Sequence, residues 1–100
     1  MSPPRSLTLD HFTPHVGERL PLVLKEGERT DAVLLEAAAL EEVPSAGAEE
    51  GFSLLLHVPA AEHLPQRIYE LEHPREGTVS LFLVPVGMRD GGILLEAVFN

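Results

Sequence analysis

The last third of the chain constrains the fold more than any other part of the sequence. Three runs there, 68–73, 79–84 and 93–100, place apolar residues at every second position, and turn-forming residues separate the runs at 74–77 and 87–92. Side chains on a strand point alternately to opposite faces, so each run can bury one face as a set. The pattern predicts three β-strands joined by two turns.

Two earlier segments extend this pattern. Residues 18–26 and 52–58 alternate in the same way, and Glu26-Gly27-Glu28 predicts a hairpin turn after the first of them. Before these strands, residues 7–14 predict a short helical turn that Thr8 can cap.

Residues 30–43 fit two structures. Good helix formers fill the stretch, and apolar residues fall at helical spacing at Val33, Leu34, Ala37 and Leu40. A strand would instead place on one face Val33, Leu35, Ala37 and Ala39. Local propensity favours a helix and the hairpin signal upstream favours a strand, so the residues alone leave both open.

Together these segments predict a flexible stretch at residues 1–6 and a single β domain at residues 7–100. Five to seven short strands at regular spacing are typical of a mainly-β fold, a small antiparallel β-barrel or sandwich, here with a short N-terminal helical turn. The predicted core is Phe12, Leu20, Leu22, Leu24, Leu35, Phe52, Leu54, Leu56, Tyr69, Leu71, Val79, Leu81, Leu83, Leu95, Ala97 and Phe99.

Composition excludes several classes of function. The 100 residues contain no Cys, which removes disulfides and thiolate chemistry, and 16 acidic against 7 basic residues give a net charge of −9. Nucleic acids and anionic membranes attract basic proteins, so neither is expected as a partner. No apolar run is long enough for a membrane helix and no signal peptide is evident, so we expect a cytoplasmic protein.

Side chains that could carry chemistry are few. His11 and His15 have the spacing of a helical metal pair, but Pro14 interrupts the helix that this spacing requires. We therefore expect no metal, no cofactor and no catalytic residues.

One polar constellation remains. Tyr69, Glu70 and His73 combine a phenol, a carboxylate and an imidazole, which are groups of acid–base catalysis. On a strand Glu70 points away from the other two. The favoured interpretation places Tyr69 in the core and lets His73 cap the strand end by bonding the turn backbone.

A second set of apolar residues falls on the faces opposite the core, at Val23, Leu55, Phe82, Val84, Leu94 and Val98. Contiguous exposed apolar side chains are typical of interaction surfaces. This set predicts a homodimer or docking onto a larger protein. The alternative is that other segments of the same chain cover it.

Several blocks of the sequence resemble a family of small bacterial proteins, about 100 residues long, catalogued as a domain of unknown function. The blocks are Tyr69-x-x-x-His73-Pro74-x-x-Gly77, Leu81-Phe-Leu-Val-Pro-x-Gly87 and the C-terminal Glu96-Ala-Val-Phe-Asn100. The resemblance implies that residues 32–40 form a strand. It also suggests phage-tail-like neighbours for the family and brings no catalytic residues.

Two functional hypotheses follow. The first is a non-catalytic interaction or structural module that assembles with itself or within a larger, phage-tail-like assembly. The alternative is a small-molecule-binding protein or minor enzyme with a site at the barrel mouth near Tyr69, Glu70 and His73. The absence of a catalytic constellation favours the first.

Overall fold

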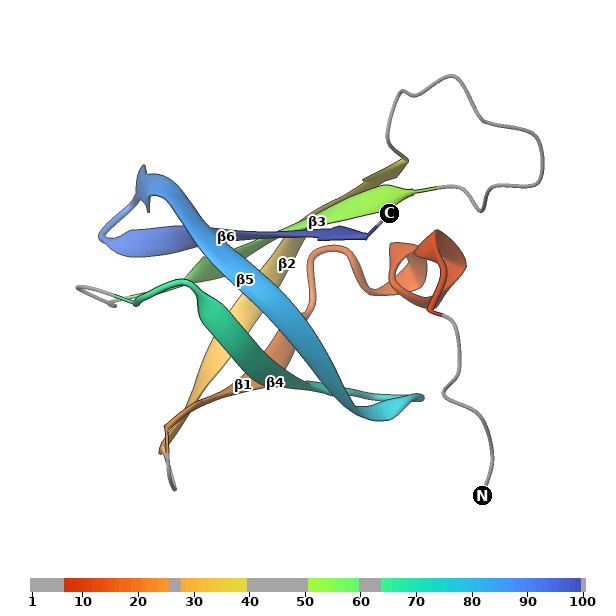
Figure 1. Ribbon diagram of the computed structural model, residues 1–100, viewed down its shortest axis with the longest axis horizontal. Helices are drawn as coiled ribbons and strands as arrows, with labels where there is room; N and C mark the ends of the chain where they lie inside the picture. Colours follow the sequence, from red (N-terminus) through yellow and green to blue (C-terminus); the bar gives the residue numbers. More distant parts are fainter. Residues whose placement is uncertain (1–6, 26–27, 40–50, 60–63, 100) are drawn as a thin grey trace.

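Six antiparallel strands close into a barrel in the computed structural model, which describes residues 7–25, 28–39, 51–59 and 64–99 (Figure 1). Around the barrel the order is β1-β2-β3-β6-β5-β4. The elements in chain order are the 3₁₀ turns η1 (Leu9–His11) and η2 (Thr13–His15) and the strands β1 (Arg19–Lys25), β2 (Glu28–Ala39), β3 (Phe52–Val58), β4 (Arg67–His73), β5 (Gly77–Arg89) and β6 (Gly92–Phe99). The predicted fold class is confirmed. The residues of the predicted flexible N-terminus and of the turn at 26–27 lie outside the described ranges.

The barrel closes through a narrow seam between β1 and β4. In the described part of the chain two residue pairs join these strands, Leu22–Leu71 and Val23–Glu70. On the outer surface Arg29 of β2 reaches Glu72 of β4, with 2.9 Å between Nη1 and Oε2. Because β1 lies between β2 and β4, this ion pair spans the seam, although its exposure limits its contribution to stability.

The stretch that fitted both a helix and a strand forms β2 as far as Ala39, and residues 40–43 lie outside the described ranges. A bulge between Leu34 and Glu36 shifts the register against β3, so that Leu35 is the extra residue. Ala32 and Leu34 are therefore buried in place of the predicted Leu35. The prediction of Leu35 as a core residue was wrong, whereas Ala37 beyond the bulge does pack against the core.

Inward-facing side chains fill the barrel with a single core. Most predicted core residues are buried, but Leu24 and Phe99 are only partly buried at its edges. Four further apolar residues are buried that the predicted core did not include, which are Ala32, Leu34, Val58 and Ile93, and the last two continue the alternation of their runs. At about 1.5–3 kcal/mol for each fully buried large apolar side chain, this core is the main source of stability.

The two turns of the last third differ from one another. The first is Pro74–Glu76, followed by Gly77 at a φ of 77°, as expected for a break there. The predicted break at 87–92 contains the turn but was too long, because β5 continues through Gly87 to Arg89 and β6 begins at Gly92. A bulge at Val86 keeps β5 paired with β6, and the turn consists of Asp90 and Gly91, both with positive φ.

Phe12 closes one end of the barrel, called here the plugged end. Its side chain is fully buried and its ring centroid lies 6.0 Å from that of Phe52 and 6.2 Å from that of Phe99. A backbone hydrogen bond from the Gly17 N–H to the Leu34 carbonyl joins the N-terminal turn that carries Phe12 to β2. In Figure 1 this end lies beside η1 and η2.

The other end, called here the hairpin end, carries the turn between β5 and β6. Residues 85–91 are all exposed. His57 Nε2 donates to the Arg89 carbonyl at 2.7 Å and so anchors this hairpin to β3. Gly92 lies against β3, where a Cβ would meet the Val58 carbonyl oxygen and lie 2.9 Å from Pro59 Cα. Only glycine allows this close approach of the two backbones.

Candidate functional site

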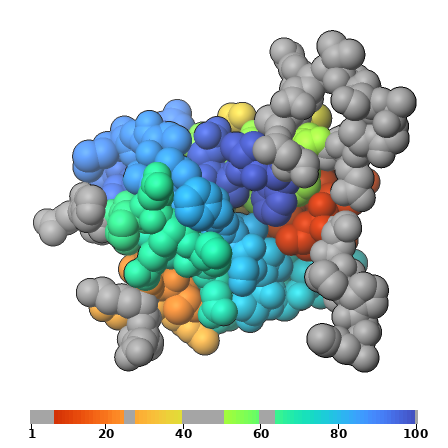
Figure 2. Space-filling model, in the orientation of Figure 1, coloured from red at the N-terminus to blue at the C-terminus, as the bar shows by residue number. Residues whose placement is uncertain are grey.

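The outer surface of β4, β5 and β6 carries a group of apolar side chains called here the outer apolar face. Five of its members have exposed fractions between 50% and 69% and the sixth, Val84, is half-buried. Figure 2 shows the side of the molecule that these strands form. The members of the outer apolar face are Ile68, Phe82, Val84, Val86, Met88 and Val98.

Strand register places these residues next to one another. Ile68 of β4 pairs directly with Phe82 of β5, and Val84 follows Phe82 on the same face. Val84 pairs with Glu96 of β6, two residues from Val98. Directly opposed side chains on neighbouring strands lie in contact range, so the face is contiguous.

The predicted set coincides with this face only in part. Phe82 and Val98 are exposed, whereas Val23, Leu55, Val84 and Leu94 are half-buried. Four of the set surround Glu96 on adjacent strands, and these are Leu55, Val84, Leu94 and Val98. Val23 lies apart on β1, beyond β4.

Three exposed members of the face were missed by sequence reasoning. Ile68 could have been found, because it alternates with the buried Tyr69. Met88 falls within the predicted break at 87–92 and Val86 lies just before it, beyond the predicted run 79–84, so the pattern gave no reason to place them on a strand.

Charged side chains of both signs surround the face. Arg67 and Arg89 are exposed near the hairpin end, Glu70 is exposed on β4, and Glu96 is half-buried among the apolar side chains. Within the described residues none of these four forms an ion pair. The face therefore offers both signs of charge to a partner.

The strand edge beside this face is protected against pairing with another chain. Beyond Leu83, β5 has no described partner on its β4 side. Pro85 removes a backbone donor there, and the bulge at Val86 interrupts the regular spacing. Contact through side chains is thus favoured over strand addition.

A polar cluster at the plugged end centres on His73, which is 4% exposed. Its Nε2 lies 2.5 Å from the His11 carbonyl oxygen, and its Nδ1 lies 3.0 Å from Arg75 N and 3.1 Å from Glu76 N. A carbonyl accepts and an amide donates, so Nε2 carries the proton and Nδ1 accepts both bonds. The predicted interaction of His73 with the turn backbone is present.

Two further histidines flank His73. The Thr8 amide donates to Nδ1 of His11, so the proton of this ring lies on Nε2, 3.8 Å from the Glu76 carboxylate. His15 holds Glu18 through Nδ1 at 3.0 Å, and its ring lies edge-on to that of His73 at 4.7 Å.

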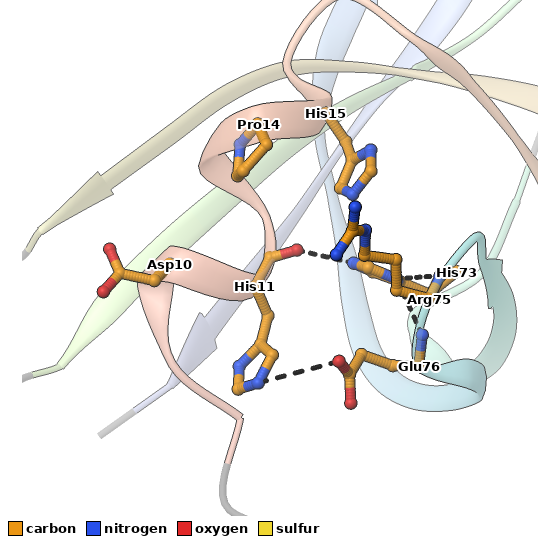
Figure 3. Close-up of a pocket in the computed structure, with 7 residues that line it drawn as sticks. All are labelled: Asp10, His11, Pro14, His15, His73, Arg75 and Glu76. Carbon is orange, nitrogen blue, oxygen red and sulfur yellow. Dashed lines mark hydrogen bonds and ion pairs between the residues drawn. The ribbon is translucent and has the colours of Figure 1, made fainter.

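An open hollow of about 420 Å³ lies over this cluster (Figure 3). In the close-up Arg75 extends toward His15, Glu76 faces His11, and Asp10 points away from the rest. The hollow is lined by Asp10, His11, Pro14, His15, His73, Arg75 and Glu76. Within the described residues no three metal-ligating side chains lie close enough together to hold a metal ion.

The structure does not bring the predicted polar site together. Tyr69 is buried and donates its hydroxyl to the Pro65 carbonyl at 2.5 Å, and Glu70 lies on the outer surface. Burial raises the pKa of Tyr69, and the nearby Arg67 guanidinium, 5.0 Å from the ring centroid, partly offsets this. Of the three predicted residues only His73 lines the hollow.

Comparisons with known proteins agree with the resemblance seen in the sequence. Residues 7–99 match the family model for a domain of unknown function, DUF6916. Searches of curated proteins and of solved structures gave no match. None of the described helices is long and apolar enough to cross a membrane.

Proposed function

We propose a role for this chain, which belongs to the DUF6916 family of unknown function, as a non-catalytic interaction module that pairs with a second copy of itself through the outer apolar face. The observation that carries the proposal is the contiguity of Ile68, Phe82 and Val84 across β4 and β5. Monomeric proteins seldom expose a large continuous apolar patch without using it.

The charges around the face support a second copy as the partner. A two-fold contact brings the same surface of each copy together, so residues of opposite charge on one face can pair across it. Arg67 and Arg89 can then meet Glu70 and Glu96 of the other copy. We further propose that such a pair works in the cytoplasm, as a unit of a larger, phage-tail-like assembly.

Sedimentation velocity of the purified chain over a wide range of concentration tests this role. The wild type is expected to form dimers as concentration rises, and Phe82→Ser to weaken dimerisation by roughly 30-fold or more, as for a central interface residue. Val16→Ser is the matched control, because Val16 is a comparably exposed apolar residue on the N-terminal turn. A wild type that stays monomeric at high concentration, or equal weakening by both substitutions, would contradict the proposal.

A second candidate, small-molecule binding, rests on the hollow beside His73. Its volume of about 420 Å³ falls in the usual range for ligand sites, but the hollow is open to solvent and six of its seven lining residues have polar or charged side chains. A fragment screen followed by amide chemical shifts tests it. Binding would shift the amides of Arg75 and Glu76, and an absence of shifts there with every fragment would remove this candidate.

A further inference from the structure

His73 differs from an ordinary capping residue because both of its ring nitrogens are engaged in opposite senses. Nε2 donates to the His11 carbonyl, while Nδ1 accepts from the amides of Arg75 and Glu76. The three contacts join η1 to the turn between β4 and β5, across 62 residues of sequence. The ring thus holds two distant segments together in its neutral form only.

The His73 ring cannot carry a proton on both nitrogens while it keeps these three hydrogen bonds. Protonation of His73 would place an N–H on Nδ1, directly against two backbone N–H groups, and both hydrogen bonds would be lost. The ring is buried against Phe12, with 5.3 Å between centroids, so the charge would also lose hydration. A second proton on the ring and the two bonds from the turn amides therefore exclude one another.

The charged and titratable groups around His73 do not offset the loss of the bonds at Nδ1. From η2 the ring of His15 lies edge-on to that of His73, and the Glu18 carboxylate contacts Nδ1 of His15. From the turn, Arg75 adds positive charge to the hollow, and the Glu76 carboxylate faces His11. Asp10, the remaining acid of the lining, points away from the cluster.

We propose that His73 is an acid-sensitive latch that holds the N-terminal turn, and with it Phe12, on the plugged end of the barrel. At neutral pH the latch is closed. Acid opens the latch, because a second proton on the ring breaks both of its bonds to the turn amides. Opening frees the turn at residues 74–76 and uncovers the aromatic rings beneath Phe12.

His57 provides a matched control within the same chain. It also donates Nε2 to a backbone carbonyl, that of Arg89, but none of the described residues donates to its Nδ1. Protonation of His57 therefore keeps its hydrogen bond. Two substitutions test the latch itself: His73→Asn can keep an acceptor for the turn amides and His73→Gln can keep a donor for the His11 carbonyl, and neither side chain titrates.

The experiment is urea unfolding, followed by circular dichroism, between pH 8 and pH 5 for the wild type, His57→Gln and both His73 variants. The unfolding equilibrium constant of the wild type and of His57→Gln is expected to rise roughly tenfold more than that of either His73 variant over this range. Parallel pH curves for the wild type and the His73 variants would overturn the proposal.

Nuclear magnetic resonance of the wild type provides a test that needs no variant. Ring nitrogen shifts report which nitrogen carries the proton, and we expect a protonated Nε2 and an unprotonated Nδ1 at neutral pH. The amide signals of Arg75 and Glu76 should move together as the ring takes up its second proton. A folded protein with a doubly protonated His73 and unmoved amides at these two residues would overturn the latch even if the variants failed to fold.

Discussion

The two ends of the barrel are closed by different means. At the plugged end Phe12 is fully buried among aromatic rings, and His73 beneath it is bonded through both ring nitrogens. At the hairpin end His57 makes one such bond to the Arg89 carbonyl, and the residues of β5 beyond Val84 are exposed. Burial and hydrogen bonding concentrate stability at the first end, which leaves the second end and the adjoining outer apolar face available for contact with a partner.

The largest effect is expected at the plugged end. Phe12→Ala removes a fully buried ring and leaves a cavity beside the stacked rings of Phe52 and Phe99, at a cost of about 3–5 kcal/mol in the free energy of unfolding. Urea unfolding measures it. Val16→Ala in the same segment is the control and should change stability by less than about 0.5 kcal/mol, because Val16 is exposed. Similar costs for both variants would contradict the assigned role of Phe12.

A smaller effect is expected where the hairpin end meets β3. In Gly92→Ala the new Cβ meets the backbone of Val58 and Pro59, which cannot move aside without disturbing β3, at a cost of about 1–3 kcal/mol. Gly87→Ala is the matched control, since its Cβ would lie 3.8 Å from the Leu94 side chain and the backbone needs no positive φ. Equal thermal stability of the two variants would show that the close approach at Gly92 is absent.

A still smaller effect on stability is expected from Tyr69, which is buried inside the barrel. Tyr69→Phe removes one hydrogen bond to the Pro65 carbonyl and should cost about 0.5–1.5 kcal/mol. Because burial raises the pKa of Tyr69 above 10.0, the unfolded chain releases this proton first, and stability falls as the pH rises beyond that value. Alkaline unfolding of the wild type and Tyr69→Phe measures this. A wild-type curve no steeper than that of the variant would contradict it.

The smallest effect on stability is expected on the outer apolar face. Phe82→Ser and Met88→Ser change side chains that are more than half exposed, so the unfolding free energy of the monomer should stay within about 0.5 kcal/mol of the wild type. Urea unfolding at a concentration below dimer formation measures this. A loss as large as that of Phe12→Ala would mean that the face belongs to the core.

Sequence reasoning succeeded where one face of a strand is buried along its whole length. The period of two in β3 and β4 shows directly which side chains of 52–58 and 69–73 point inward. It failed at Leu35 and at Val86, because a bulge depends on the partner strand and leaves no local signal.

The polar cluster could be predicted only in part. The contact of His73 with its own turn follows from Pro74 and the strand end, which are local features. Its contact with the His11 carbonyl joins residues far apart in the sequence and exists only once the barrel has closed. For the same reason no pattern in the sequence places Arg75 and His15 in one hollow.

We assign stability to the plugged end and contact with a partner to the outer apolar face. The most direct test is to record amide and methyl nuclear magnetic resonance spectra of the wild type over a range of protein concentrations. If the outer apolar face holds a second copy, signals from Ile68, Phe82, Val84 and Val98 should shift as concentration rises. Signals from His15, Arg75 and Glu76 at the plugged end should stay unchanged. Shifts confined to the plugged end, or no shifts at any concentration, would contradict the account.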